Sequence, residues 1–226
     1  GNSNEKYLQG YERDFIQTTK LCKMIIDKKI RMIFLSSGGT VYGNQEIQPI
    51  SEDALPRPIN HYGNVKLCIE NTIRTFNYQA HTKILIARIS NPYGPGQDFN
   101  KGVGFIDAAI KKTIRSEKIE IWGDGNNVRD YIYIDDVCRM LISLFYYQED
   151  YDTFNISSNT GTSQRDVIRM LEAMQLAPQV EYLPARSVDA KKIILNNERI
   201  MSIHAVPLVP VEQGIRKYYQ WLKKEI

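Results

Sequence analysis

The sequence lacks the features that mark membrane, secreted and nucleic-acid-binding proteins. No apolar run in its 226 residues approaches the roughly 20 residues that a membrane-spanning helix needs. The first residues, GNSNEKYLQGYERD, are polar and do not have the pattern of a signal peptide. The net charge of +3 comes from scattered residues, without the dense Lys/Arg run that nucleic acid attracts. We therefore expect no membrane and no nucleic acid as partners.

Cysteine is also scarce, and its placement excludes two uses. The three cysteines, Cys22, Cys68 and Cys138, cannot all pair and do not have the spacing of metal ligands. They are typical of small buried side chains in a reducing compartment, so the sequence predicts a cytoplasmic protein without a metal site. Hydrophobic residues make up 42% and charged residues 24% of the chain, as in ordinary globular proteins.

The first half of the chain alternates between two kinds of apolar pattern. Helical spacing covers about residues 11–28 and 60–79, with Val65, Ile69 and Ile73 on one stripe of the second segment. Each segment is followed by a short continuous apolar run, IRMIFLSS and then KILIARI. Continuous apolar strands that alternate with helices are typical of a parallel sheet covered by helices, so the fold class predicted is α/β.

Beyond Asn91 the pattern loosens into a long loop rich in glycine and proline, NPYGPGQDFNKGVG. Shorter helices and strands follow, and the chain ends in a helical pattern, VEQGIRKYYQWLKK. Long loops after strands are where α/β proteins build binding sites. The second half is therefore expected to carry the substrate side.

The stretch HYGNVK places Tyr62 and Lys66 four residues apart at the start of the second helix. At that spacing the two side chains share one helix face. An ammonium beside a phenol favours phenolate, which lowers the pKa of the tyrosine and makes it a general acid or base. The same spacing is common by chance on helix surfaces, so the pair alone does not establish a function.

Two loops flank this pair in the sequence. SSGGTVYG (residues 36–43) follows one buried strand, and RISNPYGPG (residues 88–96) follows the next. Hydroxyls and glycines at the carboxyl ends of parallel strands lie where ligands bind in open α/β sheets. A hydroxyl there would hydrogen-bond a substrate oxygen while Tyr62 transfers its proton.

The motifs LSSGGTVYG, HYGNVK, ARISNPYGPG and GDGNNVRDYIYIDDV, in this order, resemble those of the NAD-dependent epimerase/dehydratase family. This family is the extended branch of the short-chain dehydrogenases/reductases and acts on nucleotide sugars. The resemblance covers about residues 11–221 and is nearest to the UDP-glucose 4-epimerases and their UDP-N-acetylhexosamine relatives. It implies the C-terminal part of a Rossmann-type parallel sheet with helices on both faces, plus a smaller α/β substrate-binding domain.

The resemblance also implies domain boundaries. Residues 1–90 with about 131–157 would form a partial NAD-binding domain, and residues 91–130 and 158–226 the substrate-binding domain. None of the fourteen glycines forms the glycine-rich turn that lets a backbone approach a pyrophosphate. The sequence is therefore expected to start at the helix before the family's fifth strand, which leaves an unpaired apolar sheet edge.

Three explanations of the missing turn stay open. The missing part of the NAD-binding domain, on the order of 90 residues, belongs to the same polypeptide, or it comes from another chain. Alternatively, the protein has lost NAD binding, and Tyr62 and Lys66 are relics.

The resemblance assigns roles to individual residues. Tyr62 would be the catalytic base, and Lys66 would hold the nicotinamide ribose. The substrate-binding positions are Asn91 for the nucleotide sugar, Glu120 to Trp122 beside the uracil, Arg129 and Arg186 for the diphosphate, and Asp189 for the ribose. Guanidinium suits a diphosphate because its planar donors bind two oxygens at once. The alternatives are surface salt bridges for the two arginines and a turn cap for Asn91.

The family's catalytic hydroxyl lies four residues before the tyrosine of VYG, and that position is Gly38 here. Thr40 is favoured as its replacement because it shares a face with Gly38 if the segment is extended. Ser37 is the rival, and Ser36 is assigned to the cofactor site.

The predicted reaction is 4-epimerisation of a nucleotide sugar through a transient 4-keto sugar, with bound NAD. Dehydration is disfavoured because the family's Asp-Glu pair is replaced by Gly39-Thr40, and the glutamate of the family's decarboxylases is also absent. A keto-sugar reductase remains an alternative, and so does a non-catalytic nucleotide-sugar-binding fragment. The apolar helix that carries Tyr62 favours a homodimer.

Overall fold

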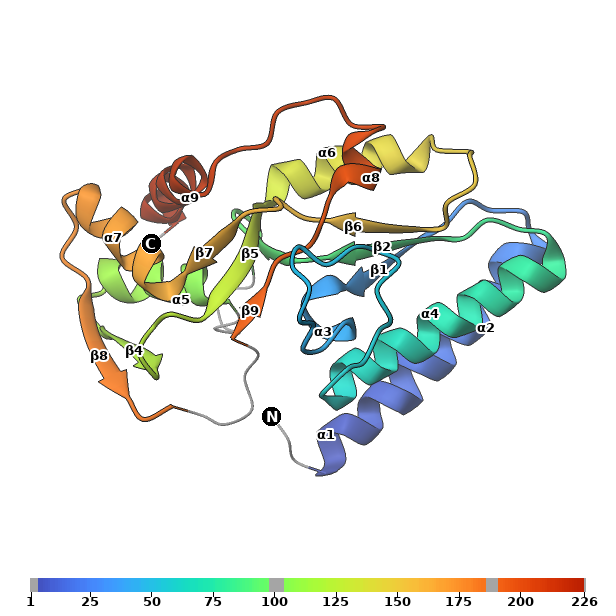
Figure 1. The fold of residues 1–226 in the computed structure, drawn as a ribbon, viewed down its shortest axis with the longest axis horizontal. Helices are drawn as coiled ribbons and strands as arrows, with labels where there is room; N and C mark the ends of the chain where they lie inside the picture. Colours follow the sequence, from blue (N-terminus) through green and yellow to red (C-terminus); the bar gives the residue numbers. More distant parts are fainter. Residues whose placement is uncertain (1–3, 98–103, 186–190, 226) are drawn as a thin grey trace. The chain divides into compact units, whose positions relative to one another are not determined.

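The computed structural model of the protein describes residues 4–97, 104–185 and 191–225. The chain divides into two compact units (Figure 1). Unit 1 contains residues 1–90, 140–156 and 195–205, and unit 2 contains residues 91–139, 157–194 and 206–226. No helix among the described residues is both long enough and apolar enough to cross a membrane.

Unit 1 is built on a parallel sheet of three strands. The strands are β1 (Ile33–Ser37), β2 (Leu85–Ile89) and β6 (Thr153–Ile156), in the order β1-β2-β6. Ser37 pairs with Ile89, and Ile89 with Ile156, so the carboxyl ends of the strands meet at one edge of the sheet. The predicted parallel sheet is confirmed.

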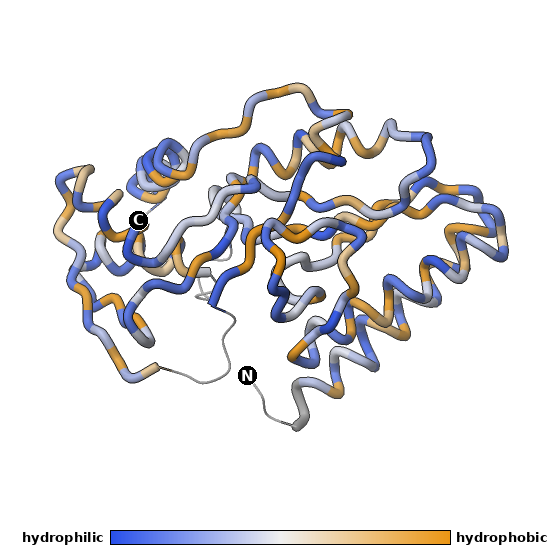
Figure 2. The backbone as a smooth tube through the Cα atoms, viewed as in Figure 1, coloured by the Kyte–Doolittle hydropathy of each residue, from blue (hydrophilic) through white to orange (hydrophobic). Residues whose placement is uncertain are grey.

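Helices α2 (Ile16–Asp27) and α4 (His61–Ala80) cover one face of this sheet. The apolar stripe of α4 points inward, where it packs with Cys22 of α2 and with sheet residues; this cluster comprises Cys22, Phe34, Val65, Ile69, Ile73, Ile84 and Ile86. Figure 2 shows the same periodicity as alternating hydrophobic and hydrophilic stretches along both helices. Before α2 come α1 (Asn4–Gln9) and a π-helical stretch, η1 (Gly10–Phe15).

The two faces of the sheet are not covered equally. The short helix α8 (Glu198–Met201) contacts β6 and lies across the sheet from α2 and α4 (Figure 1). Strand β2 is buried from Leu85 to Arg88, as a strand covered on both faces must be. Strand β1 pairs only with β2 among the described residues, and its Leu35 is 47% exposed. The expected unpaired apolar edge is therefore present in the described part of the chain.

Unit 2 contains a mixed sheet around β5 (Val128–Tyr133). Strand β5 runs parallel to β3 (Asn91–Tyr93) and β9 (Lys192–Ile193) and antiparallel to β7 (Gly161–Ser163). A separate parallel pair joins β4 (Lys118–Trp122) to β8 (Gln179–Leu183). The helices are α5 (Phe105–Ile114), α6 (Ile134–Phe145, shared with unit 1), α7 (Gln164–Ala173) and α9 (Val211–Glu225).

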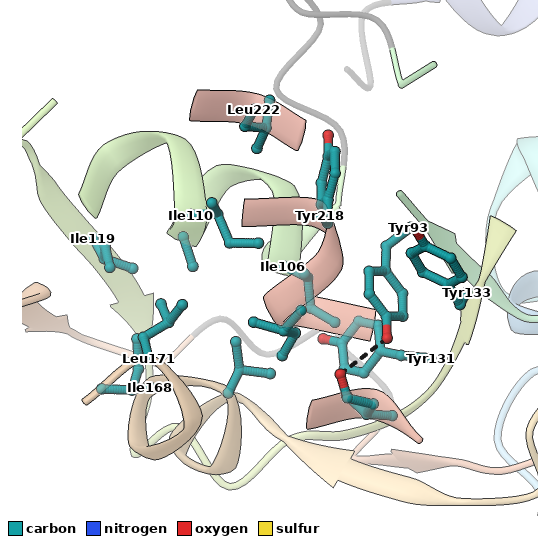
Figure 3. Close-up of a cluster of buried hydrophobic side chains, with 14 of the residues drawn as sticks. Tyr93, Ile106, Ile110, Ile119, Tyr131, Tyr133, Ile168, Leu171, Tyr218 and Leu222 are labelled. Carbon is teal, nitrogen blue, oxygen red and sulfur yellow. Dashed lines mark hydrogen bonds between the residues drawn. The ribbon is translucent and has the colours of Figure 1, made fainter. Parts of the chain in front are cut away.

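The core of unit 2 is rich in tyrosine. Figure 3 shows Tyr93, Tyr131 and Tyr133 beside isoleucines and leucines of the helices. Tyr93 donates a hydrogen bond of 3.1 Å to the carbonyl oxygen of Val211, at the start of α9. This bond satisfies the buried hydroxyl and fixes the start of the last helix against the sheet.

The unit boundaries differ from the predicted domains in two segments. Residues 131–139 belong to unit 2, because β5 continues to Tyr133 within the mixed sheet. Residues 195–205 belong to unit 1, because Leu195 bridges to Ile50 and the Asn155 side chain bonds the Asn196 carbonyl oxygen at 3.0 Å. Neither exchange alters the placement of Tyr62 and Lys66.

Candidate active site

The start of α4 positions the predicted Tyr/Lys pair. The extended residue Asn60 caps the helix, since its side chain accepts from the backbone N–H of Gly63 at 2.8 Å. Tyr62 and Lys66 then lie on successive turns, and the Lys66 ammonium is 5.7 Å from the centroid of the Tyr62 ring. The structure therefore brings the two side chains together.

Gly63, between the two, lets this first turn approach its neighbour closely. A Cβ atom at position 63 would lie 2.6 Å from the carbonyl oxygen of Thr40 and 3.1 Å from Pro58. Thr40 belongs to the helical turn α3 (Gly38–Val41), which follows β1 directly. The first turn of α4 thus packs on the SSGGTVYG segment without an intervening side chain.

Ser37 is the last residue of β1, and its side chain lies next to the predicted catalytic tyrosine. Its side chain hydrogen-bonds the Tyr62 phenol and partly offsets the rise in the phenol's pKa that burial causes. The Thr40 hydroxyl instead donates to the Ser37 carbonyl oxygen at 3.4 Å. Thr40 was favoured on the assumption of an extended segment, and that assumption is wrong because residues 38–41 form a helical turn.

Gly38 stands at the family's hydroxyl position because the space beside it is filled. A Cβ atom there would lie 2.3 Å from a methyl group of Leu195 and 3.1 Å from the carbonyl oxygen of Arg88. A serine or threonine at this position would require its neighbours to shift. Among the nearby residues, Ser37 and Thr40 carry hydroxyls, and the Ser37 side chain is the one that interacts with the Tyr62 phenol.

The electrostatics of the pair differ from the prediction. Burial raises the pKa of Tyr62, the Ser37 hydrogen bond lowers it, and the Asp14 carboxylate raises it. The Lys66 charge does not dominate, and the expected lowering of the tyrosine pKa is not found. The pKa of Lys66 is itself lowered by burial, against the opposing charges of Asp14 and Glu70. The Lys66 ammonium donates to the carbonyl oxygen of Leu35 at 3.2 Å.

Asp14, in η1, was not singled out from the sequence. The helix that contains Asp14 was predicted, but helical spacing alone does not identify which residues of another helix an exposed carboxylate faces. The N-terminal helices lie against α4 through Tyr11, whose hydroxyl accepts from Asn64 at 2.7 Å and bonds His61 at 3.3 Å. This packing brings the Asp14 charge within reach of Tyr62 and Lys66.

Ser36 does not have the role that the sequence suggested. Its side chain is buried, and its hydroxyl donates to Glu70 of α4 at 2.6 Å. The hydroxyl is thus engaged within the protein, on the helix-covered side of β1. The donor of Ser36 is therefore committed to Glu70, and its assignment to a cofactor site stays a prediction.

In unit 2, two predicted substrate residues line one cavity. Asn91 and Arg129 lie on its wall, and its volume is about 220 Å³. The Asn91 amide donates to the Asp130 carbonyl oxygen at 2.9 Å, which fixes its orientation. The side-chain oxygen of Gln164, also in the wall, is buried without a hydrogen-bond partner among the described residues. The cavity wall thus offers a ligand both a hydrogen-bond donor, the Arg129 guanidinium, and a hydrogen-bond acceptor, the Gln164 side-chain oxygen.

The remaining predicted substrate residues lie elsewhere. Glu120 and Trp122 are on β4 and are not part of that cavity wall; Glu120 is exposed and Trp122 half-buried. Arg186 and Asp189 lie outside the described residues. Among the residues that are described, no three His, Cys, Asp or Glu side chains are grouped to hold a metal ion.

The residues at the end of β1 fit part of a dinucleotide site. A phenol, a serine hydroxyl and a half-buried ammonium are the donors that a ribose and a reacting oxygen require. The ammonium's bond to a backbone carbonyl can be exchanged for one to a ribose hydroxyl. This donor set is therefore consistent with a nicotinamide cofactor.

The comparisons with known proteins agree with this geometry. Residues 1–157 match the NAD dependent epimerase/dehydratase family. A putative UDP-glucose 4-epimerase of Methanocaldococcus jannaschii is 26% identical over 224 residues, which cover 98% of this chain and 73% of the relative. The dTDP-4-dehydro-6-deoxyglucose reductase of Escherichia coli is 33% identical over 189 residues, 83% of this chain and 60% of the relative.

A solved structure shows the same fold. The UDP-glucose 4-epimerase of Thermotoga maritima, crystallised with UDP-glucose, superposes with a TM-score of 0.91 at 28% identity, over 98% of this chain and 72% of that chain. The chain belongs to the NAD-dependent epimerase/dehydratase family of enzymes. It spans between 60% and 73% of the length of these three relatives.

Proposed function

We propose that the protein is a nucleotide-sugar 4-epimerase that works with bound NAD on a UDP-sugar. One observation carries the proposal: the Tyr62 phenol interacts with the Ser37 side chain at the carboxyl end of β1, and the Lys66 ammonium lies 5.7 Å from its ring centroid. A binding protein would have no need of a hydroxyl and an ammonium around a phenol.

The residues of the chain would perform proton transfer and orientation. Tyr62 would remove the proton from the sugar 4-hydroxyl and later return it, while Ser37 hydrogen-bonds the same oxygen. Thr40, whose hydroxyl faces the backbone of Ser37, is the less favoured second hydroxyl. Lys66 would exchange its bond to Leu35 for one to the nicotinamide ribose. NAD, when bound, supplies the reversible hydride transfer at the sugar carbon.

Part of the nucleotide would be held by unit 2. Arg129 would bind diphosphate oxygens from the cavity wall, and Asn91 would contact the nucleotide sugar. Glu120 and Trp122 would flank the uracil on β4, largely through backbone groups. Arg186 and Asp189 would contact diphosphate and ribose.

The Tyr62→Phe substitution tests the proposal in the full-length protein. Epimerisation of UDP-glucose or UDP-N-acetylglucosamine is expected to fall by roughly 10²–10⁴-fold, because the general acid/base is removed. Tyr78→Phe is the matched control, since Tyr78 lies near the other end of α4 and is 85% exposed. Undiminished epimerase activity in the Tyr62 variant would exclude the role given to the phenol.

A keto-sugar reductase is the second candidate, and the 33% identity to the Escherichia coli reductase favours it. The two reactions differ in their use of the cofactor. An epimerase regenerates NAD in each turnover, whereas a reductase consumes one NADH or NADPH for each keto sugar reduced. Following reduced nicotinamide by its absorbance during turnover distinguishes them. Tight binding of a UDP-sugar without either reaction would support a binding protein instead.

We further infer a cytoplasmic homodimer that pairs through α2 and α4. The outer side of α2 exposes Leu21 (42%) and Met24 (47%), side chains that a partner helix would bury. The three free cysteines are compatible with a reducing compartment. Leu21→Glu with Met24→Glu should convert a dimer into a monomer in light scattering. A protein that is monomeric before substitution would contradict this arrangement.

A further inference from the structure

A buried carboxylate lies on the same helix stripe as the Tyr/Lys pair. Tyr62, Lys66 and Glu70 follow one another at four-residue spacing, so they share one face of α4. Glu70 is fully buried, in a helix whose opposite side faces solvent. A buried charge is unfavourable unless it is fully paired, so its partners indicate its purpose.

The strongest partner of Glu70 is Arg88 of β2, which is 1% exposed. Its Nη2 donates to one carboxylate oxygen at 2.7 Å, and its Nε lies 3.1 Å and 3.2 Å from the two oxygens. Ser36 donates to the carboxylate at 2.6 Å, and Arg74 at 3.3 Å. The carboxylate is thus held in a fixed orientation by two strands and its own helix.

Arg88 extends this network beyond α4. Its Nη1 donates to the Tyr42 hydroxyl at 2.9 Å, and that hydroxyl donates to the Asn155 side chain at 2.7 Å. Tyr42 directly follows the helical turn α3. One guanidinium therefore joins the helix of Tyr62, the strand β2 and the segment that follows Ser37.

Three consecutive residues of β1 meet the same helix stripe. The Leu35 carbonyl oxygen accepts from Lys66, the Ser36 hydroxyl donates to Glu70, and the Ser37 side chain hydrogen-bonds Tyr62. Of the three contacts, the one at Glu70 is buried and the other two are partly open to solvent. The buried contact is the one that water cannot replace.

We propose that the Glu70–Arg88 ion pair is a positioning device that fixes the rotation of α4, and thereby holds Tyr62 on Ser37. The apolar contacts of α4, through Val65, Ile69 and Ile73, are not directional and allow a helix to turn slightly about its axis. A bidentate guanidinium–carboxylate pair is directional. The inference rests on the proposed role of Tyr62 in proton transfer.

The decisive variant is the double substitution Glu70→Gln with Arg88→Met. It removes one charge of each sign, so no unpaired charge stays buried and the net field at Tyr62 changes little. The ionisation of the tyrosines is followed by near-ultraviolet absorbance as pH is raised. The contribution of Tyr62 is the difference between two otherwise identical proteins, one with Tyr62 and one with Tyr62→Phe. The charged groups that face the phenol, Asp14 and Lys66, are unchanged in every protein compared.

The expected result is a higher pKa for the Tyr62 phenol, because the Ser37 hydrogen bond that lowers it is lost. In the full-length enzyme kcat should fall by roughly 10- to 100-fold with KM within about twofold, as for a lost transition-state contact. Loss of the Glu70 charge alone would move the phenol pKa down, so the sign separates positioning from a field effect.

Ile73→Ala is the matched control, because Ile73 is buried in the same helix and belongs to its apolar cluster, without a polar group that could join the network. It should lower the melting temperature without moving the phenol titration. If the double variant does not fold, Ser36→Ala removes only the β1 contact of Glu70 and should give a smaller shift in the same direction.

An unchanged phenol titration in the double variant overturns the inference, even if the protein melts earlier. Failure of the proposed function gives a different result, since Tyr62→Phe would then leave turnover intact. The titration needs neither cofactor nor substrate, so the two failures are distinguishable.

Discussion

Each unit contains a buried ion pair, and the two pairs are built differently. In unit 2, Asp107 and Lys111 are four residues apart on α5, with Nζ and Oδ2 at 2.8 Å. In unit 1, Glu70 on α4 meets Arg88 on β2 at 2.7 Å. The first pair lies within one helical turn, whereas the second joins two elements of the fold.

The difference is between an ion pair that stabilises one helix and an ion pair that stabilises the packing of a helix on a sheet. A pair at i and i+4 is favoured in an isolated helix and contributes to the helix itself. A helix-to-strand pair forms only once the helix has packed on the sheet, so it selects one packing among several. The polar network of unit 1 therefore acts on the geometry of the site, while the pair in unit 2 acts on α5.

Arg88→Met is expected to have the largest effect on stability. It leaves the Glu70 carboxylate buried with only Ser36 and the partly exposed Arg74 as partners, and should lower the free energy of unfolding by about 3–5 kcal/mol. Denaturant unfolding followed by circular dichroism measures it. A loss below about 1 kcal/mol would mean that water reaches the carboxylate.

Alkaline pH should weaken both units through their buried tyrosines, and Tyr42 in unit 1 and Tyr131 in unit 2 allow the effect to be compared between the units. Burial raises the pKa of Tyr42 in unit 1 to about 12, and burial likewise raises that of Tyr131 in unit 2 to about 12. Their unfolded pKa is about 10, so the stabilisation is present below pH ~10 and is lost as pH rises toward ~12. Each group should contribute a slope of about −1.4 kcal/mol per pH unit.

Tyr42→Phe and Tyr131→Phe remove these slopes one at a time. Unfolding is measured by denaturant at several pH values between about 9 and 12, where the native tyrosines keep their protons and the unfolded ones lose them. Trp122 and Trp221 both belong to unit 2, so their fluorescence follows that unit. An unchanged slope in a variant would show that its tyrosine is accessible to solvent.

Lys111→Met should have the smallest effect of the three. Asp107 keeps the hydrogen bond from the Tyr218 hydroxyl, and its place in the first turn of α5 favours a carboxylate through the helix dipole. The expected loss is about 1–2 kcal/mol, measured by tryptophan fluorescence during unfolding. A loss equal to that of Arg88→Met would remove the distinction between the two pairs.

The elements of the fold that depend on periodicity could be predicted from the sequence. The stripe of Val65, Ile69 and Ile73 gave α4 its inward face, and the spacing of Tyr62 and Lys66 placed them together. The order of four short motifs along the chain identified the family. These features depend on residues close in sequence, or on a resemblance that covers most of the chain.

The rest of the site depends on contacts between distant residues. Arg88 stands in an apolar strand, and a charge there must find a buried partner, but no spacing identifies Glu70. The helical turn at residues 38–41 contains two glycines, so neither an extended nor a helical path was excluded by propensity. That turn removes the reason for which Thr40 was favoured over Ser37, because the reason assumed an extended segment.

The close approach at Gly63 has a consequence for mutational scanning. Because a methyl group at this position meets the backbone of residue 40, nearly every substitution should displace the start of α4. Position 63 would then score as essential although glycine carries no reactive group. Intolerance to substitution at this position would report the short distance between two backbone segments. It would therefore draw attention to the neighbouring candidate active site through a residue that takes no part in the chemistry.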